Sequence, residues 1–324
     1  MKQVRQSAIS SVPKYDRYLR VDKRFITEGE QIEFNLYAAA DKSDMSLFLQ
    51  SETVVDGSAK VRLREIELLY ISEAERQQFE DYVARHLRAI ARNSAMPLDE
   101  KVTIIYEKAS EALESMFHNP EALENVAKAQ TIVGGVVDTI LHDNATVASL
   151  MKITAHDYYT HTHSINVSFY ALCLGDFLRM GEKDLEALGM AALLHDLGKS
   201  KVSETIINKN GRLSEAEFEI MKGHPAMGYE IACSLGISDN RILSGIRHHH
   251  EKLSGNGYPD RLGGERISHF ARIIGVCDVF DALTTKRAYK DPMRSFDALL
   301  LMKNEMQGHL DMGVVDTFIK MLRE

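Results

Sequence analysis

A histidine and an aspartate stand next to each other, His195-Asp196, directly after the apolar run Ala191–Leu194. Adjacent residues on a helix point about 100° apart, so the two side chains share a site only where the helix ends or bends. Gly198 follows, and glycine tolerates the left-handed conformation that ends many helices. A buried histidine-carboxylate pair is costly unless it is satisfied, and a divalent metal satisfies it well. The alternative is a capped helix end with a structural histidine.

Further metal-ligating residue types recur down the chain, each in an apolar segment or next to a turn. A single histidine of this kind is more often structural than a ligand, but the set supplies five imidazoles and two carboxylates. Nitrogen and oxygen donors without thiolate suit iron, manganese, nickel, cobalt or catalytic zinc, and seven donors are about what two metal ions need. The set is His163, His195, Asp196, His224, His249, His250 and Asp278.

Helices must position these residues, because the pattern is helical from Pro97 to the end of the chain. Ser214 and Glu217 form a capping box that opens one helix, and Pro225 after His224 suits the first turn of another. His161 lies two residues from His163, so the two would face different sides of a helix and we expect only one of them to be a ligand. A glycine-rich loop, 254–259, follows the triple histidine 248–250.

The segment before this helical half is different. Short apolar stretches between about residues 15 and 71 are separated by turn-forming residues such as Glu28-Gly29 and Asp56-Gly57, which predicts a small strand-rich domain. Ser72 then caps a helix that runs to about Arg92. We therefore expect three parts: an N-terminal α+β domain over 1–95, a helical linker over 96–153 and a catalytic domain over 154–324.

The linker carries apolar residues three and four apart, from Val102 to Ile140, with a break at Asn119-Pro120 where a second helix is expected to start. Such spacing favours helices that pack lengthwise. A bundle within the chain and a homodimer through residues 97–142 fit this pattern equally well.

Composition limits the classes of function. Of 324 residues, 27% are charged and 44% hydrophobic, and the net charge of −8 argues against non-specific binding to a nucleic-acid polymer. No signal peptide or long apolar span is evident, so we expect a cytoplasmic protein without a membrane span. The cysteines Cys173, Cys233 and Cys277 fit reduced core thiols rather than disulfides or a zinc site.

The motifs resemble the HD superfamily of metal-dependent phosphohydrolases, and specifically the HD-GYP cyclic-dinucleotide phosphodiesterases of bacterial signalling. The resemblance covers about residues 158–322. Residues 15–90 resemble, more faintly, a small domain found ahead of some bacterial HD-GYP modules. It implies a mainly α, all-helical phosphohydrolase bundle behind the N-terminal α+β domain. The motifs that carry it are His195-Asp196-Leu197-Gly198-Lys199, His249-His250-Glu251, Gly257-Tyr258-Pro259 and 278–284.

This resemblance also implies roles for individual residues. The seven residues named above would hold two divalent metal ions, with iron or manganese favoured and nickel, cobalt or zinc as alternatives, and Asp196 would bridge them. Lys199 is expected to take part in catalysis and in phosphate binding. Arg287 and Lys290 would also meet substrate phosphate, and Tyr258 would line the substrate pocket.

The implied function is hydrolysis of cyclic di-GMP to linear pGpG, with GMP as the alternative end product, by a hydroxide that bridges the metals. Alternatives are a hydrolase of a hybrid cyclic GMP-AMP and a catalytically weak cyclic-dinucleotide sensor. A different HD phosphohydrolase, such as a nucleotidase, is disfavoured by the intact loop 257–259. Two positions depart from the family pattern. Tyr159 stands where some members have a glutamate for a third metal, and Ser254 stands where many have an aspartate.

Overall fold

A computed structural model describes residues 18–21, 23–39, 45–94, 96–143, 160–209, 211–285 and 291–323. The chain divides into two compact units, 1–86 and 87–324, and α2 (Arg76–Arg92) runs through the boundary between them. None of the helices in the described ranges is both long and apolar enough to cross a bilayer.

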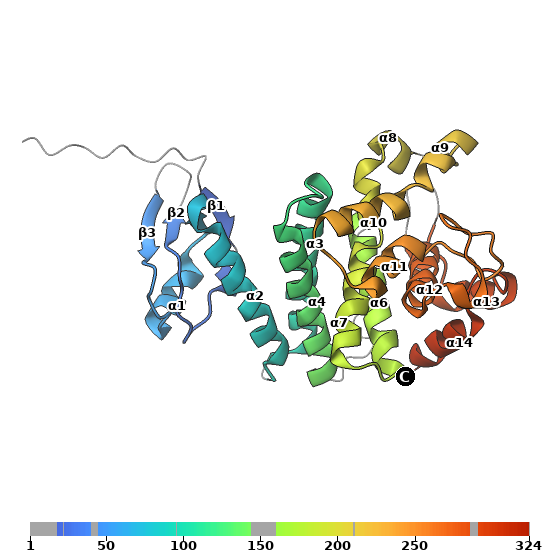
Figure 1. Cartoon of the computed structure of the whole chain (residues 1–324). Helices are drawn as coiled ribbons and strands as arrows, with labels where there is room; N and C mark the ends of the chain where they lie inside the picture. Colours follow the sequence, from blue (N-terminus) through green and yellow to red (C-terminus); the bar gives the residue numbers. More distant parts are fainter. Residues whose placement is uncertain are drawn as a thin grey trace, which may run out of the picture. The chain divides into compact units, whose positions relative to one another are not determined.

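The first unit contains an antiparallel four-stranded sheet in the order β1-β4-β2-β3 (Figure 1). The predicted strand-rich domain is therefore confirmed, together with the smaller α+β unit of the expected fold class. One local interpretation was wrong: Asp56-Gly57 is not a simple turn, because Asp56 Oδ1 accepts the N–H of Ala59 at 2.7 Å and caps a helix. The elements are β1 (Tyr18–Val21), η2 (Lys23–Phe25), β2 (Leu36–Ala39), β3 (Met45–Leu49), α1 (Gly57–Glu65), β4 (Leu68–Ser72) and η3 (Glu73–Glu75).

The core of this unit forms because alternate strand residues face the helices. Phe34 lies at its centre, with the rings of Phe79 and Tyr82 edge-on at centroid distances of 5.3 Å. Ser72 caps the turn that leads into α2, as predicted, since its Oγ accepts the N–H of Ala74 at 3.3 Å.

The second unit is all-helical in its described ranges, as expected. Its elements are α3 (Leu98–His118), α4 (Glu124–Asp143), α6 (Thr160–Phe177), α7 (Glu182–Leu194), η4 (Leu197–Lys201), α8 (Glu204–Ile207), α9 (Glu215–Met221), α10 (His224–Ser234), α11 (Asn240–His248), η5 (Gly264–Arg266), α12 (His269–Thr284), α13 (Ser295–Glu305) and α14 (Met312–Met321).

Four helices form the centre of this unit, with α6 and α11 each packing on both α7 and α12 (Figure 1). Most of α12 is buried, because it is apolar on nearly every side. The short helix α10 packs on α11 and on η4. The ends of α7 and α11, the starts of α6 and α10 and the middle of α12 thereby converge.

The helices of the predicted linker pack on this centre. α3 contacts α4 and α6, and α4 contacts α7, so the apolar face that includes Val102, Ile105 and Val133 is buried within the chain. The structure therefore contains the intramolecular bundle, whereas dimerisation through 97–142 remains a prediction. The second helix does not start at Asn119-Pro120 as expected. Asn119 ends α3, and α4 begins at Glu124.

Candidate metal centre and substrate pocket

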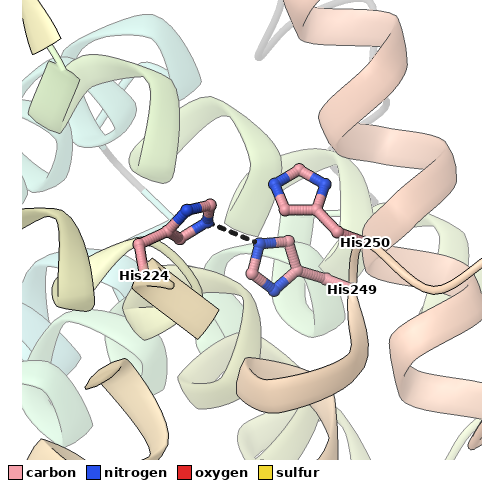
Figure 2. A group of neighbouring side chains, drawn as sticks. All are labelled: His224, His249 and His250. Carbon is pink, nitrogen blue, oxygen red and sulfur yellow. Dashed lines mark hydrogen bonds between the residues drawn. The ribbon is translucent and has the colours of Figure 1, made fainter. Parts of the chain in front are cut away.

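The seven predicted ligands lie together at the centre of the second unit. One donor atom from each residue of three overlapping groups lies within 4.8 Å of the others: His224, His249 and His250; His163, His195 and Asp278; His195, Asp196 and His249. Figure 2 shows the first group, with His224 and His249 turned toward each other and His250 beside them. Six of the seven are buried, and His250 is partly open to solvent.

The adjacent pair His195-Asp196 meets at one site because α7 ends there. His195 still has helical backbone angles, whereas Asp196 has φ −98° and ψ 4°, which turns its side chain toward the cluster. Gly198 does not end the helix in the left-handed conformation that we expected. It lies inside η4, and a Cβ atom there would come 1.9 Å from the carbonyl oxygen of His224. The glycine is required for close packing of η4 on α10.

Three of the histidines share one orienting contact. Each donates its Nδ1–H to a backbone carbonyl three residues earlier, at 2.7 Å. A carbonyl only accepts, so Nδ1 carries the hydrogen and Nε2 is left with a free lone pair. Nε2 of each ring then faces the cluster, ready to bind a cation. The pairs are His195 with Ala192, His224 with Met221, and His249 with Ile246.

His163 is oriented by a carboxylate instead. Its Nδ1–H donates to Asp281 Oδ2 at 2.6 Å, and Asn166 donates to Asp281 Oδ1 at 2.9 Å. Asp281 is fully buried, and both of its carboxylate oxygens are engaged by these donors. The opposite ring atom, His163 Nε2, lies 3.0 Å from Asp278 Oδ1. Asp281 therefore orients His163, one of the predicted ligands, and is not among the predicted ligands itself.

The charges of the cluster are strongly coupled. Burial alone would raise the pKa of Asp196, but Lys199 and the neighbouring histidines hold it well below its usual range. Burial lowers the pKa of His250 to about 3 and that of His249 well below its usual value. Burial would also lower the pKa of His163, yet its hydrogen bonds to Asp278 and Asp281 raise that pKa to about 9. Without a cation, His163 holds the proton that offsets the carboxylates.

Two buried polar atoms of the cluster indicate whether its residues fit a metal ion. His195 Nε2 and Asp196 Oδ1 have no hydrogen-bond partner, although His224 Nε2 lies 3.1 Å from Asp196 Oδ1. Buried polar atoms are normally satisfied, and a cation would satisfy both. The donors are imidazole nitrogen and carboxylate oxygen, as expected for a non-thiolate divalent site. The residues present fit the metal centre.

The signature loop 254–263 is held against the cluster by Glu251. Its two carboxylate oxygens accept the backbone N–H groups of Asp260 and Leu262 at 2.7 and 2.9 Å. Gly257 lies so close to the backbone of Glu251 that an added Cβ would be 2.4 Å from its Cα. These contacts anchor the loop although Ser254 stands where many family members have an aspartate.

Tyr258 of this loop lies beside the cluster, with its ring centroid 4.8 Å from that of His250. Tyr258 also lines a pocket of about 650 Å³. The other lining residues are Phe218, Glu219, Lys222, Gly223, Lys252, Asn256, Gly257, Pro259 and Arg261. Tyr258 thus lies at the wall of a pocket and next to the predicted metal ligand His250, while its contact with substrate stays a prediction.

Lys199 lies at the edge of the cluster, with Nζ 2.5 Å from Asp196 Oδ2 and its side chain 20% exposed, and its contact with phosphate stays a prediction. Arg287, Lys290 and Tyr159 lie outside the described residues. Asp281 and Glu251 were part of motifs in the sequence, but we assigned neither a role. The signal for Asp281 was its position three residues after Asp278 on the same apolar helix.

Comparisons with known proteins agree with this geometry. The family model described as "HD domain" matches residues 142–314. A cyclic di-GMP phosphodiesterase of Pseudomonas aeruginosa is 32% identical over 69% of this chain and 55% of its own length. A 3'3'-cGAMP-specific phosphodiesterase of Vibrio cholerae is 32% identical over 72% of this chain and 51% of its own. The chain thus spans about half the length of these relatives.

A solved structure has the same fold along most of the chain. Bd1817, described as an HDG"Y"P protein from Bdellovibrio bacteriovorus, superposes with a TM-score of 0.66 at 20% sequence identity. The match covers 95% of this chain and 100% of that one.

Proposed function

Because the chain belongs to the HD-domain family, we propose that it is a metal-dependent phosphodiesterase that hydrolyses cyclic di-GMP to linear pGpG, with GMP as the alternative end product. The observation that carries this proposal is the buried set of seven nitrogen and oxygen donors beside the loop 257–259. Relatives named as cyclic di-GMP phosphodiesterases support the substrate.

Two divalent cations are proposed, iron or manganese in the first place. His224, His249 and His250 would hold one, and His163, His195 and Asp278 the other. Asp196 faces both groups, because its Oδ1 lies 3.1 Å from His224 Nε2 and its Oδ2 lies 3.7 Å from His163 Nε2. This position supports the proposal that Asp196 bridges the two ions.

Paired divalent ions, when bound, supply Lewis-acid stabilisation of phosphate oxygens and lower the pKa of a bound water. The chain positions the reacting phosphate around them. Lys199 is proposed to donate to a non-bridging phosphate oxygen, since its ammonium is partly exposed at the edge of the carboxylate cluster. Arg287 and Lys290 are proposed as further phosphate contacts. Tyr258 would exclude water from one side of the site and contact the substrate.

A second substrate is favoured by one finding: relatives from Vibrio cholerae are named 3'3'-cGAMP-specific phosphodiesterases. The hybrid cyclic GMP-AMP is therefore the second candidate. A sensor without turnover is less well supported, because all seven donors are present and their Nε2 and carboxylate atoms face one another.

The test is turnover by protein purified without oxygen, with cyclic di-GMP, 3'3'-cGAMP and cyclic di-AMP compared at equal concentration. Products are separated by liquid chromatography, and metal per chain is measured by elemental analysis. We expect pGpG or GMP from cyclic di-GMP, with about two metals per chain and loss of activity after chelation. If 3'3'-cGAMP were hydrolysed faster, it would take the place of cyclic di-GMP as the proposed substrate. Binding without hydrolysis by the metal-loaded protein would overturn the proposal that the chain is an enzyme.

A further inference from the structure

The wall of the pocket beside Tyr258 includes a phenyl ring that is only about half covered by the protein. Phe218, in the short helix α9, is 47% exposed and forms part of the wall of this pocket of about 650 Å³. Apolar side chains of this size are normally buried, and an aromatic ring left open in a concave site is typical of ligand contact.

The ring is fixed in place by its neighbours. Tyr258 contacts it edge-on, with ring centroids 6.5 Å apart and an angle of 83° between the planes. The ammonium of Lys222 lies 5.3 Å from the ring centroid, and Glu219 pairs with that ammonium. A continuous row of rings thus runs from the metal ligand His250 through Tyr258 to Phe218. A ligand that reaches the metal centre can therefore extend along the pocket to Phe218.

The lining of the pocket also supplies donors. Lys252 and Arg261 both line the pocket, and neither side chain makes a hydrogen bond or ion pair with another of the described residues. Arg261 also has a positive φ of 53°, a conformation that non-glycine residues rarely adopt. A guanidinium presents a planar fork of N–H donors, and guanine offers the matching pair of acceptors, O6 and N7. Adenine has a donor at the equivalent position.

We propose that this pocket binds one guanine base of the substrate, stacked on Phe218, with Arg261 donating to its O6 and N7. The inference rests on the proposed function, since it assigns a subsite for the same cyclic dinucleotide. A phosphate alone would not need an aromatic wall, whereas a purine needs a stacking surface and an edge contact together. The volume of the pocket suits a ligand of nucleotide size.

Phe218→Ala tests the stacking surface. Loss of one base-aromatic stack weakens binding by about 5- to 150-fold, so the Kd for cyclic di-GMP, measured by calorimetry, and its KM should rise by that factor. Hydrolysis of bis(p-nitrophenyl) phosphate, a diester without a base, should stay at the parental rate, because the variant leaves the metal ligands unchanged. Phe218→Trp should retain most of the affinity.

Two further variants complete the design. Phe296→Ala removes another exposed phenylalanine, 72% exposed on α13, and should behave as the parent with both substrates. Arg261→Asn introduces a residue that also tolerates positive φ but removes the guanidinium donors. The preference for cyclic di-GMP over cyclic di-AMP should therefore shrink.

The possible results separate this inference from the function it rests on. If the parent hydrolyses cyclic di-GMP while Phe218→Ala binds it with parental Kd and KM, the base subsite is wrong and the proposed function stands. If the parent binds cyclic di-GMP without hydrolysing it, weaker binding by Phe218→Ala supports the subsite alone. If the parent neither binds nor hydrolyses any cyclic dinucleotide yet cleaves the base-free diester, both proposals fail.

Discussion

Asp281→Asn should weaken metal binding although Asp281 touches no metal in the proposed site. Asp281 is fully buried in α12 and accepts three hydrogen bonds. Its Oδ2 accepts from His163 Nδ1 at 2.6 Å, while its Oδ1 accepts from Asn166 at 2.9 Å and from the Thr285 hydroxyl at 3.0 Å. The substitution keeps the size of the side chain and exchanges one acceptor oxygen for an NH₂ group.

The expected effect follows from where the new amide group must lie. The remaining oxygen is held by two donors, Asn166 and Thr285, so the NH₂ group takes the place of Oδ2 and faces His163 Nδ1. Nδ1 must then accept, and the ring hydrogen moves to Nε2, the atom proposed to bind the metal. Loss of such an orienting partner reduces metal affinity by about 10- to 100-fold, or about 1.4 to 2.7 kcal/mol.

The assay is a titration of chelated protein with manganese, followed by elemental analysis of the dialysed complex. Asp316→Asn is the matched control. Its carboxylate is exposed, pairs with Lys303 at 2.6 Å and belongs to no group of the cluster. We expect normal binding by Asp316→Asn and weaker binding by Asp281→Asn. Parental metal affinity in a folded Asp281→Asn protein would refute the assigned orientation of His163.

Three more predictions concern the same centre. Gly198→Ala places a Cβ 1.9 Å from the carbonyl oxygen of His224, so we expect a loss of about 1 to 3 kcal/mol of stability and lower metal content, checked by thermal melting; an unchanged Tm would contradict the close packing. Glu251→Gln sets an NH₂ group against a loop N–H, so the loop 254–263 should be cut faster by protease at a cost of about 1 to 3 kcal/mol, and a parental cleavage rate would count against the anchor. In chelated protein, folding raises the pKa of His163 from 6.5 to about 9, so the protonated ring stabilises the folded state. This contribution to the free energy of unfolding is fully present below pH 6.5 and is lost as the pH rises through 9. Urea unfolding of that protein should therefore show a fall of up to about 3 kcal/mol across this window, a fall that His163→Gln should remove; an equal fall in His163→Gln would assign it to other groups.

Much of the site was predictable because local signals place its residues at helix ends. Ser214 and Glu217 form the predicted capping box, with bonds of 2.6 and 3.3 Å, and His224 opens α10 just before Pro225. Such signals depend on residues three or four apart, so they can be read without knowing which distant segments come together. The seven donors then converge because the helices that carry them are apolar and must pack together.

What the sequence did not reveal depends on contacts between distant segments. The role of Asp281 requires knowing that His163, 118 residues earlier, lies opposite it. The constraint on Gly198 comes from the backbone of α10 and not from a left-handed turn. The start of α4 at Glu124 instead of Pro120 is set by Asn125, whose side chain donates to the carbonyl of Asn119 at 2.8 Å and holds the connection in place.

The cysteines show the same limit. Cys173 and Cys277 are buried thiols, as expected, and burial raises the pKa of both. Cys233 is exposed at the end of α10, so the prediction of a core thiol was wrong there. Position along an apolar stretch did not determine which face of the helix it occupied.

The most direct test of the central claim is hydrolysis of cyclic di-GMP by metal-loaded parent and Asp196→Ala proteins, with metal per chain measured on the same samples. Asp196 faces both histidine groups, so its removal should abolish turnover and reduce the metal content of the chain. Asp316→Asn, assayed alongside, should match the parent in both quantities. If Asp196→Ala retained its metals and hydrolysed cyclic di-GMP at a near-parental rate, the bridging role and the proposed catalytic centre would both be contradicted.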